Sequence, residues 1–197
     1  MVTQVFKHKT YSRTTVKNNI LRVWKKTQSN DRVDWYGKAN DFCIRIGLKY
    51  NLTSIMVAGV VASLSPVKTW EQNLKIAENM VRSGDCGHMG QFKQKAKDIL
   101  ASDGSKESIL KVLNGRKISS FFLNIIGDTE PTVTIDRHAL SIALRLKVTD
   151  EMYRGMTQQQ YEFFVECYKM VAKVVNEKPT LIQSATWVYF RKQKEIN

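Results

Sequence analysis

Residues 113–138 read LNGRKISSFFLNIIGDTEPTVTIDRH, and this stretch joins two helical signals through a short connection. The apolar residues of 116–126 recur at i, i+3, i+4 and i+7, which predicts an amphipathic helix ending at Gly127. Asp136 precedes a second apolar helical pattern, and aspartate is a preferred residue at a helix N-cap. Asp136 lies nineteen residues beyond Lys117.

The rest of the chain carries further helical signals. Residues 52–64 are apolar on nearly all sides, as in a central buried helix, and the following proline is expected to end it. Capping-box patterns at Thr69–Gln72 and Thr157–Gln160 predict two helix starts. Because the chain has only three prolines and long stretches with a 3.6-residue period, we expect an all-α protein.

The chain is strongly basic. It has 31 Lys and Arg against 18 Asp and Glu, a formal net charge of +13. The surplus is uneven, since residues 1–35 carry two acids and eight cations, namely Lys7, Lys9, Arg13, Lys17, Arg22, Lys25, Lys26 and Arg32. Nucleic acid is therefore the leading partner, and a solvated, solubilising surface is the alternative reading of each cation.

Cysteine use and hydropathy indicate the compartment. Cys43, Cys86 and Cys167 are widely spaced and odd in number, so we expect no disulfide framework and no zinc site, His88 having no partner at ligand spacing. The first thirty residues lack an apolar signal core, and the longest apolar stretch is too short to span a bilayer. These features predict a cytoplasmic protein, in a nucleoid or a host cell, that does not bind membranes.

The opening stretch has two candidate chemistries. A glycine between two helices can direct backbone N–H groups at a phosphate, and here Gly115 is expected to supply the turn while Arg116 and Lys117 supply charge. A simple helix cap is the alternative. Asp136 is either a cap alone or an acid facing a basic groove, where it would stabilise a cationic sugar or orient an attacking group.

In order, these segments resemble the helix-hairpin-helix DNA glycosylases of base excision repair, the superfamily of endonuclease III and 8-oxoguanine glycosylase. VVASLSPVKTWEQN is similar to the family's buried helix and the step that follows it, and QFKQKAKDIL to its short basic helix. LNGRKISSFFLNI is similar to the hairpin L-P-G-[VI]-G-x-K, and TIDRHALSIALRL to the segment [VI]-D-x-H. The resemblance covers roughly residues 52–146.

The resemblance implies roles for particular residues. Asp136 would be the essential acid, and Lys117 would be the lysine that bifunctional members use as nucleophile to form a Schiff base. The implied contacts to double-stranded DNA come from residues of the hairpin and its surroundings, which are Asn114, Gly115, Arg116, Lys68 and His138. The base would be flipped into a pocket, no cofactor would be needed, and the protein would act as a monomer.

The resemblance also implies an organisation in two lobes. Residues 51–135 would form a helical barrel with the hairpin, and residues 1–50 plus 136–197 a second helical lobe. LNGRK is about two residues shorter than the family hairpin, and the four clustered cysteines of the iron–sulfur branches are missing, as in a trimmed, phage-type member. Two alternatives remain, namely a catalytically inactive DNA-binding protein of this fold and a basic protein-interaction module.

Overall fold

The structure of the 197-residue chain is a computed structural model that describes residues 3–6, 8–66, 69–87, 90–129 and 132–195. Helix accounts for 70% of the residues and strand for 4%, which confirms the expectation of a mostly helical protein. The chain divides into two compact units. Unit 1 combines Met1–Trp35 with Pro131–Asn197, and unit 2 is Tyr36–Glu130.

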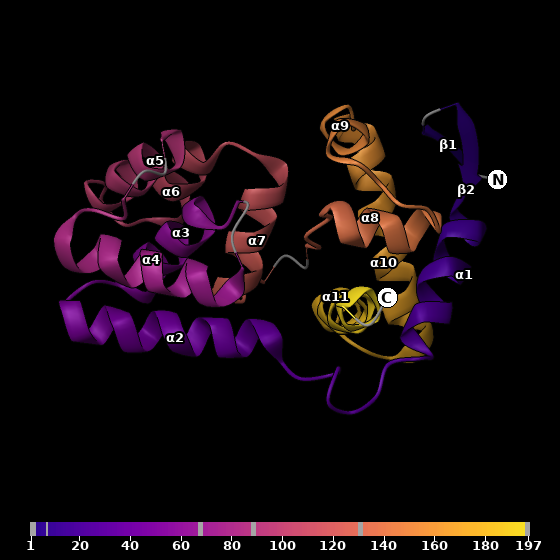
Figure 1. The fold of residues 1–197 in the computed structure, drawn as a ribbon, viewed down its shortest axis with the longest axis horizontal. Helices are drawn as coiled ribbons and strands as arrows, with labels where there is room; N and C mark the ends of the chain where they lie inside the picture. The colour runs from indigo at the N-terminus through magenta and orange to yellow at the C-terminus, as the bar shows by residue number, and fades with distance from the viewer. Residues whose placement is uncertain (1–2, 7, 67–68, 88–89, 130–131, 196–197) are drawn as a thin grey trace. The chain divides into compact units, whose positions relative to one another are not determined.

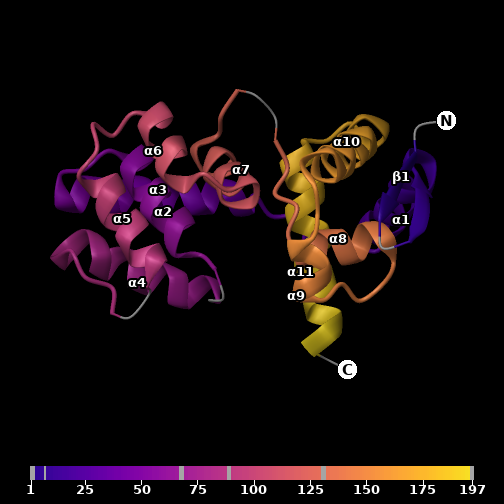
Figure 2. The same cartoon turned by 90° about the horizontal axis from the view of Figure 1, so that it is seen from above.

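Unit 2 is built from helices around a buried central one (Figures 1 and 2). Its helices are α2 (Trp35–Tyr50), α3 (Ser54–Leu64), α4 (Trp70–Ser83), α5 (Gln91–Leu100), α6 (Lys106–Leu113) and α7 (Arg116–Ile126). Every residue of α3 from Met56 to Leu64 is buried, and α4, α5, α6 and α7 pack around it. The central helix expected from the apolar run is therefore confirmed.

The close packing on α3 depends on a glycine. A Cβ at Gly59 would lie 2.8 Å from Cγ2 of Ile109 and 3.2 Å from Cγ2 of Ile99, so α5 and α6 approach the bare backbone of α3.

Among the described residues, no single helix is both long and apolar enough to cross a membrane. By length and composition alone, α2 and α3 pass together as a pair bent by 117°.

Helix α4 begins with the expected capping box. The Thr69 side chain accepts from the Gln72 backbone N–H, and the Gln72 side chain accepts from the N–H of Thr69. Its buried face, however, is rotated from the one that the apolar residues indicate. Asn73, Ala77 and Met80 are buried, and the Asn73 side chain donates to Val61 O of α3 at 3.1 Å. This hydrogen bond gives the Asn73 side-chain N–H a partner, so a polar side chain can lie on the buried face.

Helix α2 belongs to unit 2, whereas the sequence grouped residues 36–50 with the second lobe. The Asn40 side chain donates to Ile125 O of α7 at 2.8 Å, and Lys49 forms a 2.8 Å ion pair with Glu78 of α4. The apolar periodicity of α2 indicates a buried face but not the helices that α2 contacts. The two polar contacts identify those helices as α7 and α4. The boundaries therefore fall at 35/36 and 130/131 instead of 50/51 and 135/136.

Unit 1 begins with an antiparallel two-stranded ribbon that the all-α expectation did not include. Strands β1 (Thr3–Phe6) and β2 (Lys9–Ser12) pair in a register that places Thr3 opposite Ser12 and Phe6 opposite Lys9. Phe6 is buried and meets the Phe164 ring edge to face, with 6.1 Å between centroids. The ribbon is therefore part of the apolar core of unit 1.

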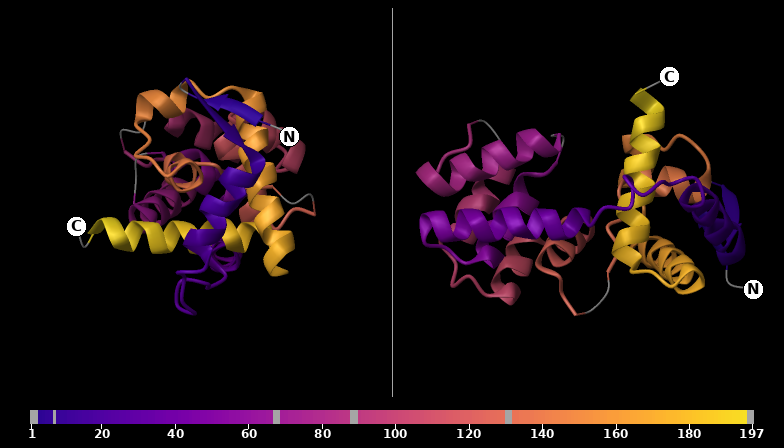
Figure 3. Two further views of the ribbon diagram at one scale, coloured as in Figure 1. Left: turned by 90° about the vertical axis from the view of Figure 1, so that its right-hand side faces the viewer. Right: turned by 90° about the horizontal axis from the view of Figure 1, so that it is seen from below.

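The helices of unit 1 come from both ends of the chain. They are α1 (Arg13–Trp24), α8 (Arg137–Leu144), α9 (Asp150–Arg154), α10 (Gln158–Val175) and α11 (Pro179–Glu195). The expected capping box of Thr157 and Gln160 starts α10. Helix α11 crosses both α1 and α10 (Figure 3), and α8 packs on α1 and α11. Asn19 of α1 donates to Ala143 O of α8 at 2.9 Å inside this core.

Candidate functional site

The turn between α6 and α7 is a helix–turn–helix of two connecting residues in unit 2. Asn114 closes α6 with φ 41° and ψ 16°, in the left-handed region. Gly115 is extended, with φ −127° and ψ 127°, and serves as the N-cap of α7. Gly115 thus lies in the turn as expected, but Asn114 takes its left-handed conformation, which asparagine tolerates better than most residues.

Lys95 of α5 holds this turn, and no local sequence pattern indicates this contact. Its Nζ donates to Leu113 O and to Asn114 Oδ1, both at 2.9 Å. A cation at the last carbonyls of α6 is favourable, since the C-terminal end of a helix carries a partial negative charge. Asn114 therefore acts in the structure as a turn residue tied to Lys95.

The first turn of α7 carries two cations. Arg116 and Lys117 are half-buried, and this turn contains no acidic residue. The first intrahelical bond runs from Ser119 N–H to Gly115 O at 2.8 Å, and Gly115 offers no side-chain cap. Because a helix N-terminus has a partial positive charge, cations there cost about 0.3–1 kcal/mol each relative to acids. This is a charge pattern suited to an anion.

Asp136 lies in unit 1 at the start of α8. Its Oδ1 accepts from the Ala139 backbone N–H at 2.7 Å, so the expected N-cap is confirmed. Its Oδ2 accepts from the indole N–H of Trp187 at 2.8 Å. The half-buried carboxylate is thus held at both oxygens, one by its own helix and one by α11.

The segment that leads to Asp136 is held by two tyrosines. The Tyr161 hydroxyl donates to Val133 O at 3.1 Å and accepts from Ile135 N–H at 3.0 Å. The Tyr153 hydroxyl donates to Ile135 O at 2.5 Å. These bonds satisfy a buried stretch of backbone that has no strand partner, and they fix the direction from which the chain enters α8.

A third tyrosine lies below the start of α8. Tyr168 is fully buried, and its hydroxyl donates to Ala139 O at 3.0 Å. Burial, and to a smaller extent the nearby Asp136 carboxylate, raise the pKa of this hydroxyl far above its usual value. Tyr168 is therefore neutral at neutral pH, and its hydroxyl remains a hydrogen-bond donor there.

His138 shares the site with Asp136. Its half-buried ring meets Trp187 edge to face at 6.1 Å between centroids and lies against Phe190 at 6.0 Å. Trp187 is therefore the common neighbour of both residues. Trp187 lies 51 residues from Asp136 in the sequence, so no local spacing connects the two residues.

The expected site residues fall into two groups. Asn114, Gly115, Arg116 and Lys117 lie together in unit 2, and Asp136 and His138 lie together in unit 1. The structure brings the members of each group together as the motifs indicate.

Three further expectations concern metals and single residues. Lys68 and His88 lie outside the described residues. Within the described ranges, no three His, Cys, Asp or Glu side chains gather so that they could hold a metal ion. Cys43, Cys86 and Cys167 are free thiols.

Comparison with known proteins gave one match. Residues 2–194 match a sequence family described as a family of unknown function, DUF7178. The chain belongs to this family. Searches among curated proteins and among solved structures found no match. The match to DUF7178 covers nearly the whole chain. The two groups of residues described above are the basis for proposing a function of this chain.

Proposed function

We propose that this DUF7178 protein binds double-stranded DNA and excises a damaged or modified base, with Asp136 as the essential acid. The observation that carries the proposal is the double fixation of the Asp136 carboxylate. Capping α8 uses Oδ1 alone, and the indole N–H of Trp187 orients Oδ2 in addition. An acid whose two oxygens are both positioned by the fold is preorganised to face developing positive charge.

The chemistry would be cleavage of the bond between the base and C1′ of the deoxyribose. The bonding electrons leave with the base, and the sugar becomes an oxocarbenium-like cation that the Asp136 carboxylate stabilises. A water oxygen then adds to C1′, and its proton passes to solvent or to the departing base. In a bifunctional variant of this reaction the neutral Lys117 amine attacks C1′ instead and loses a proton, and the C1′–O4′ bond then breaks, with O4′ taking up a proton, to give a Schiff base.

The helix pair α6–α7 would hold the DNA backbone. Arg116 and Lys117 stand at the positive end of α7, where a phosphate interacts favourably with both the helix dipole and the side chains. Gly115 has no side chain to keep a phosphate away from this end. The extended backbone of Gly115 tolerates other residues, so its lack of a side chain is the feature that would matter.

The arrangement of the chain is the second support. The resemblance implies one lobe that is continuous in sequence and carries the hairpin. The other lobe is assembled from both ends of the chain, and its later part begins with the acid segment. Unit 2 is continuous and carries the α6–α7 turn, and unit 1 is assembled from both ends and contains Asp136. The glycosylase-type fold is proposed on this basis.

Excision is tested with DNA duplexes that each carry one damaged or hypermodified base, followed by alkali to cut at abasic sites. The wild-type protein is expected to release at least one base of the panel. Asp136→Asn is expected to lower the rate by at least about a hundredfold, as for loss of a charge that stabilises a transition state. The matched control is Trp187→Phe, which removes the indole N–H but leaves the carboxylate and should retain more activity than Asp136→Asn. Excision that is unaffected by Asp136→Asn would refute the mechanism.

The role of Lys117 is tested by borohydride trapping of the covalent intermediate. Trapping by the wild-type protein that is lost in Lys117→Ala assigns the nucleophile. Lys75→Ala is the matched control, since Lys75 is an exposed lysine of the same unit on α4. Excision without trapping assigns water as the attacking group.

DNA binding is measured separately from excision, as the dependence of affinity on salt. Replacing a cation that contacts a phosphate should reduce the slope of log K against log salt by about 1. Arg116→Gln is expected to do so, and Lys75→Gln is not. Salt-dependent binding without excision would support the inactive DNA-binding alternative, and affinity for DNA that does not depend on salt would exclude both.

A further inference from the structure

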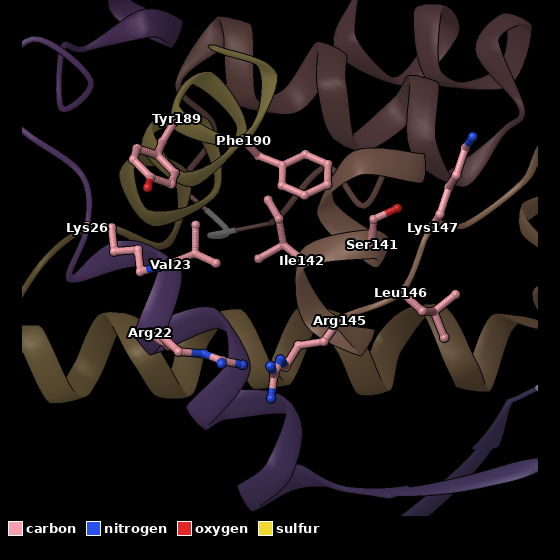
Figure 4. Close-up of a pocket in the computed structure, with 10 residues that line it drawn as sticks. All are labelled: Arg22, Val23, Lys26, Ser141, Ile142, Arg145, Leu146, Lys147, Tyr189 and Phe190. Carbon is pink, nitrogen blue, oxygen red and sulfur yellow. The ribbon is translucent and has the colours of Figure 1, made fainter. Parts of the chain in front are cut away.

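Unit 1 contains a pocket whose lining includes none of the expected site residues. It has a volume of about 420 Å³ and is formed by the end of α1, the end of α8 and the middle of α11 (Figure 4). Arg22 and Lys26 come from α1 and the residues after it, Arg145 from the end of α8, and Tyr189 and Phe190 from α11. Val23, Ile142 and Leu146 add an apolar wall.

The charged side chains of the pocket lack acidic partners. None of Arg22, Lys26 and Arg145 forms an ion pair with an Asp or Glu of the described residues. In Figure 4 the side chains of Arg22 and Arg145 extend toward one another, although both carry a positive charge, and Lys147 extends away from them. Two guanidinium groups converge in this way favourably when an anion lies between them.

Helix dipoles do not account for this charge. The C-terminal ends of α1 and α8 meet the pocket, and each contributes a partial charge of about −0.5. The three charges of Arg22, Lys26 and Arg145 against about one negative charge leave about two positive charges unbalanced, and Lys147, which also lines the pocket, adds another. The pocket therefore has the charge to bind a dianion.

The backbone of Arg145 gives a second, independent indication. This residue ends α8 in the left-handed region, with φ 55° and ψ 41°. Glycine or asparagine is the usual residue at this position, because the Cβ of other residues is crowded there. An arginine is held in an unfavourable conformation at the point where its side chain enters the pocket, as strained residues at binding sites often are.

We propose that this pocket binds the phosphate of a nucleotide, with Arg22 and Arg145 on the phosphate oxygens and the base against the aromatic rings of Tyr189 and Phe190. Arginine presents a planar fork of donors that matches phosphate oxygens. Aromatic side chains stack on nucleobases without regard to sequence. The volume lies within the range of about 300–1,000 Å³ that is usual for small-molecule sites.

Two sources can supply this ligand, a free nucleotide and a nucleotide within a strand. Isothermal titration of the full chain with a nucleoside triphosphate, a single-stranded hexanucleotide and tripolyphosphate separates them. Saturable binding of the triphosphate assigns a free nucleotide, and binding of the hexamer alone assigns a strand. Tripolyphosphate is expected to bind at least about fivefold more weakly than the triphosphate, because it lacks a base to stack. If neither nucleotide ligand binds, the proposal is overturned.

Substitutions locate the site. Arg22→Gln and Arg145→Asn are each expected to weaken nucleotide binding about tenfold or more, the loss expected for a charge-assisted hydrogen bond. Asparagine accepts the left-handed conformation, so Arg145→Asn should melt at the same temperature as the wild type or higher. Lys173→Gln on α10 removes an equal charge from unit 1 outside the pocket and should leave binding unchanged. Equal losses in Arg145→Asn and Lys173→Gln would show a general field effect and overturn the proposal.

This inference goes beyond the proposed function and does not rest on it. The pocket includes neither Asp136 nor Lys117, so excision and pocket binding can fail separately. A protein that binds nucleotide through Arg145 but releases no base would retain this inference and lose the other. If excision survives Arg145→Asn and no titration shows nucleotide binding, the proposed function is retained and this inference is lost.

Discussion

The hydrogen bond between Asp136 and Trp187 allows a sharp test of how α8 is anchored to α11. Trp187→Phe removes one donor and retains a ring that can pack on His138. A hydrogen bond to a charged group contributes about 1.5–3 kcal/mol, and the half-buried position of Asp136 favours the lower end. We therefore expect Trp187→Phe to lower the free energy of unfolding by about 1.5 kcal/mol.

Asp136→Ala removes the helix cap as well as the acceptor for the indole. The cap is worth about 1 kcal/mol, so the total loss should be about 2.5 kcal/mol. For a chain of this size 1 kcal/mol corresponds to about 2–4 °C, which gives melting temperatures lowered by about 5–10 °C for Asp136→Ala and about 3–6 °C for Trp187→Phe. The double variant should be no less stable than Asp136→Ala, because the shared bond is lost only once.

The assay is a double-mutant cycle from urea unfolding monitored by circular dichroism at neutral pH. The expected coupling energy between Asp136 and Trp187 is about 1.5 kcal/mol. Asp136→Asn gives an internal check, because its amide oxygen can cap α8 but its NH₂ then faces the indole N–H, so it should be closer in stability to Trp187→Phe than to Asp136→Ala. A coupling below about 0.5 kcal/mol, the usual error of additivity, would refute the bond as an anchor.

Three other substitutions test the fold. Tyr161→Phe leaves the buried N–H of Ile135 without its acceptor and should cost about 1–3 kcal/mol in urea unfolding, and an unchanged midpoint would contradict the bond. Gly59→Ala should cost about 1–3 kcal/mol by overpacking α3, whereas Gly115→Ala should melt within about 2 °C of the wild type. Burial alone would raise the pKa of Asp31, but hydrogen bonds from the Gln28 N–H and from Lys192 outweigh it and lower the pKa below 3.8. The stability difference between wild type and Lys192→Met should therefore be full above pH 4 and shrink as the pH falls below 3.8, and a difference that is constant down to pH 2 would rule out this pair as its source.

The parts of the fold that the sequence predicted are those set by short-range chemistry. The capping boxes of α4 and α10, the N-cap of α8, and the stop of α7 at Gly127 all depend on residues within one turn of each other. Such patterns are legible in a single sequence, because the partner of each capping group is a near neighbour.

The parts that were missed depend on partners far away in the chain or on residues used unusually. The β1–β2 ribbon turns through His8, at φ 66°, and contains no glycine or asparagine that would signal a hairpin. Asn114, and not the glycine that follows it, takes the left-handed position of the turn, and Lys95 then engages its side chain. The indole partner of Asp136 lies 51 residues away, beyond the reach of any periodicity argument.

The assembly of unit 1 from both parts of the chain sets an order for folding during synthesis. Residues 36–130 form one compact unit that is continuous in sequence, so unit 2 can close as soon as it has been synthesised. The ribbon and α1 emerge before unit 2, but Phe6 packs on Phe164 and Asn19 on Ala143, which are made after unit 2. The ribbon and α1 are therefore synthesised well before their partners, and until those partners emerge they expose apolar surface that a chaperone can bind.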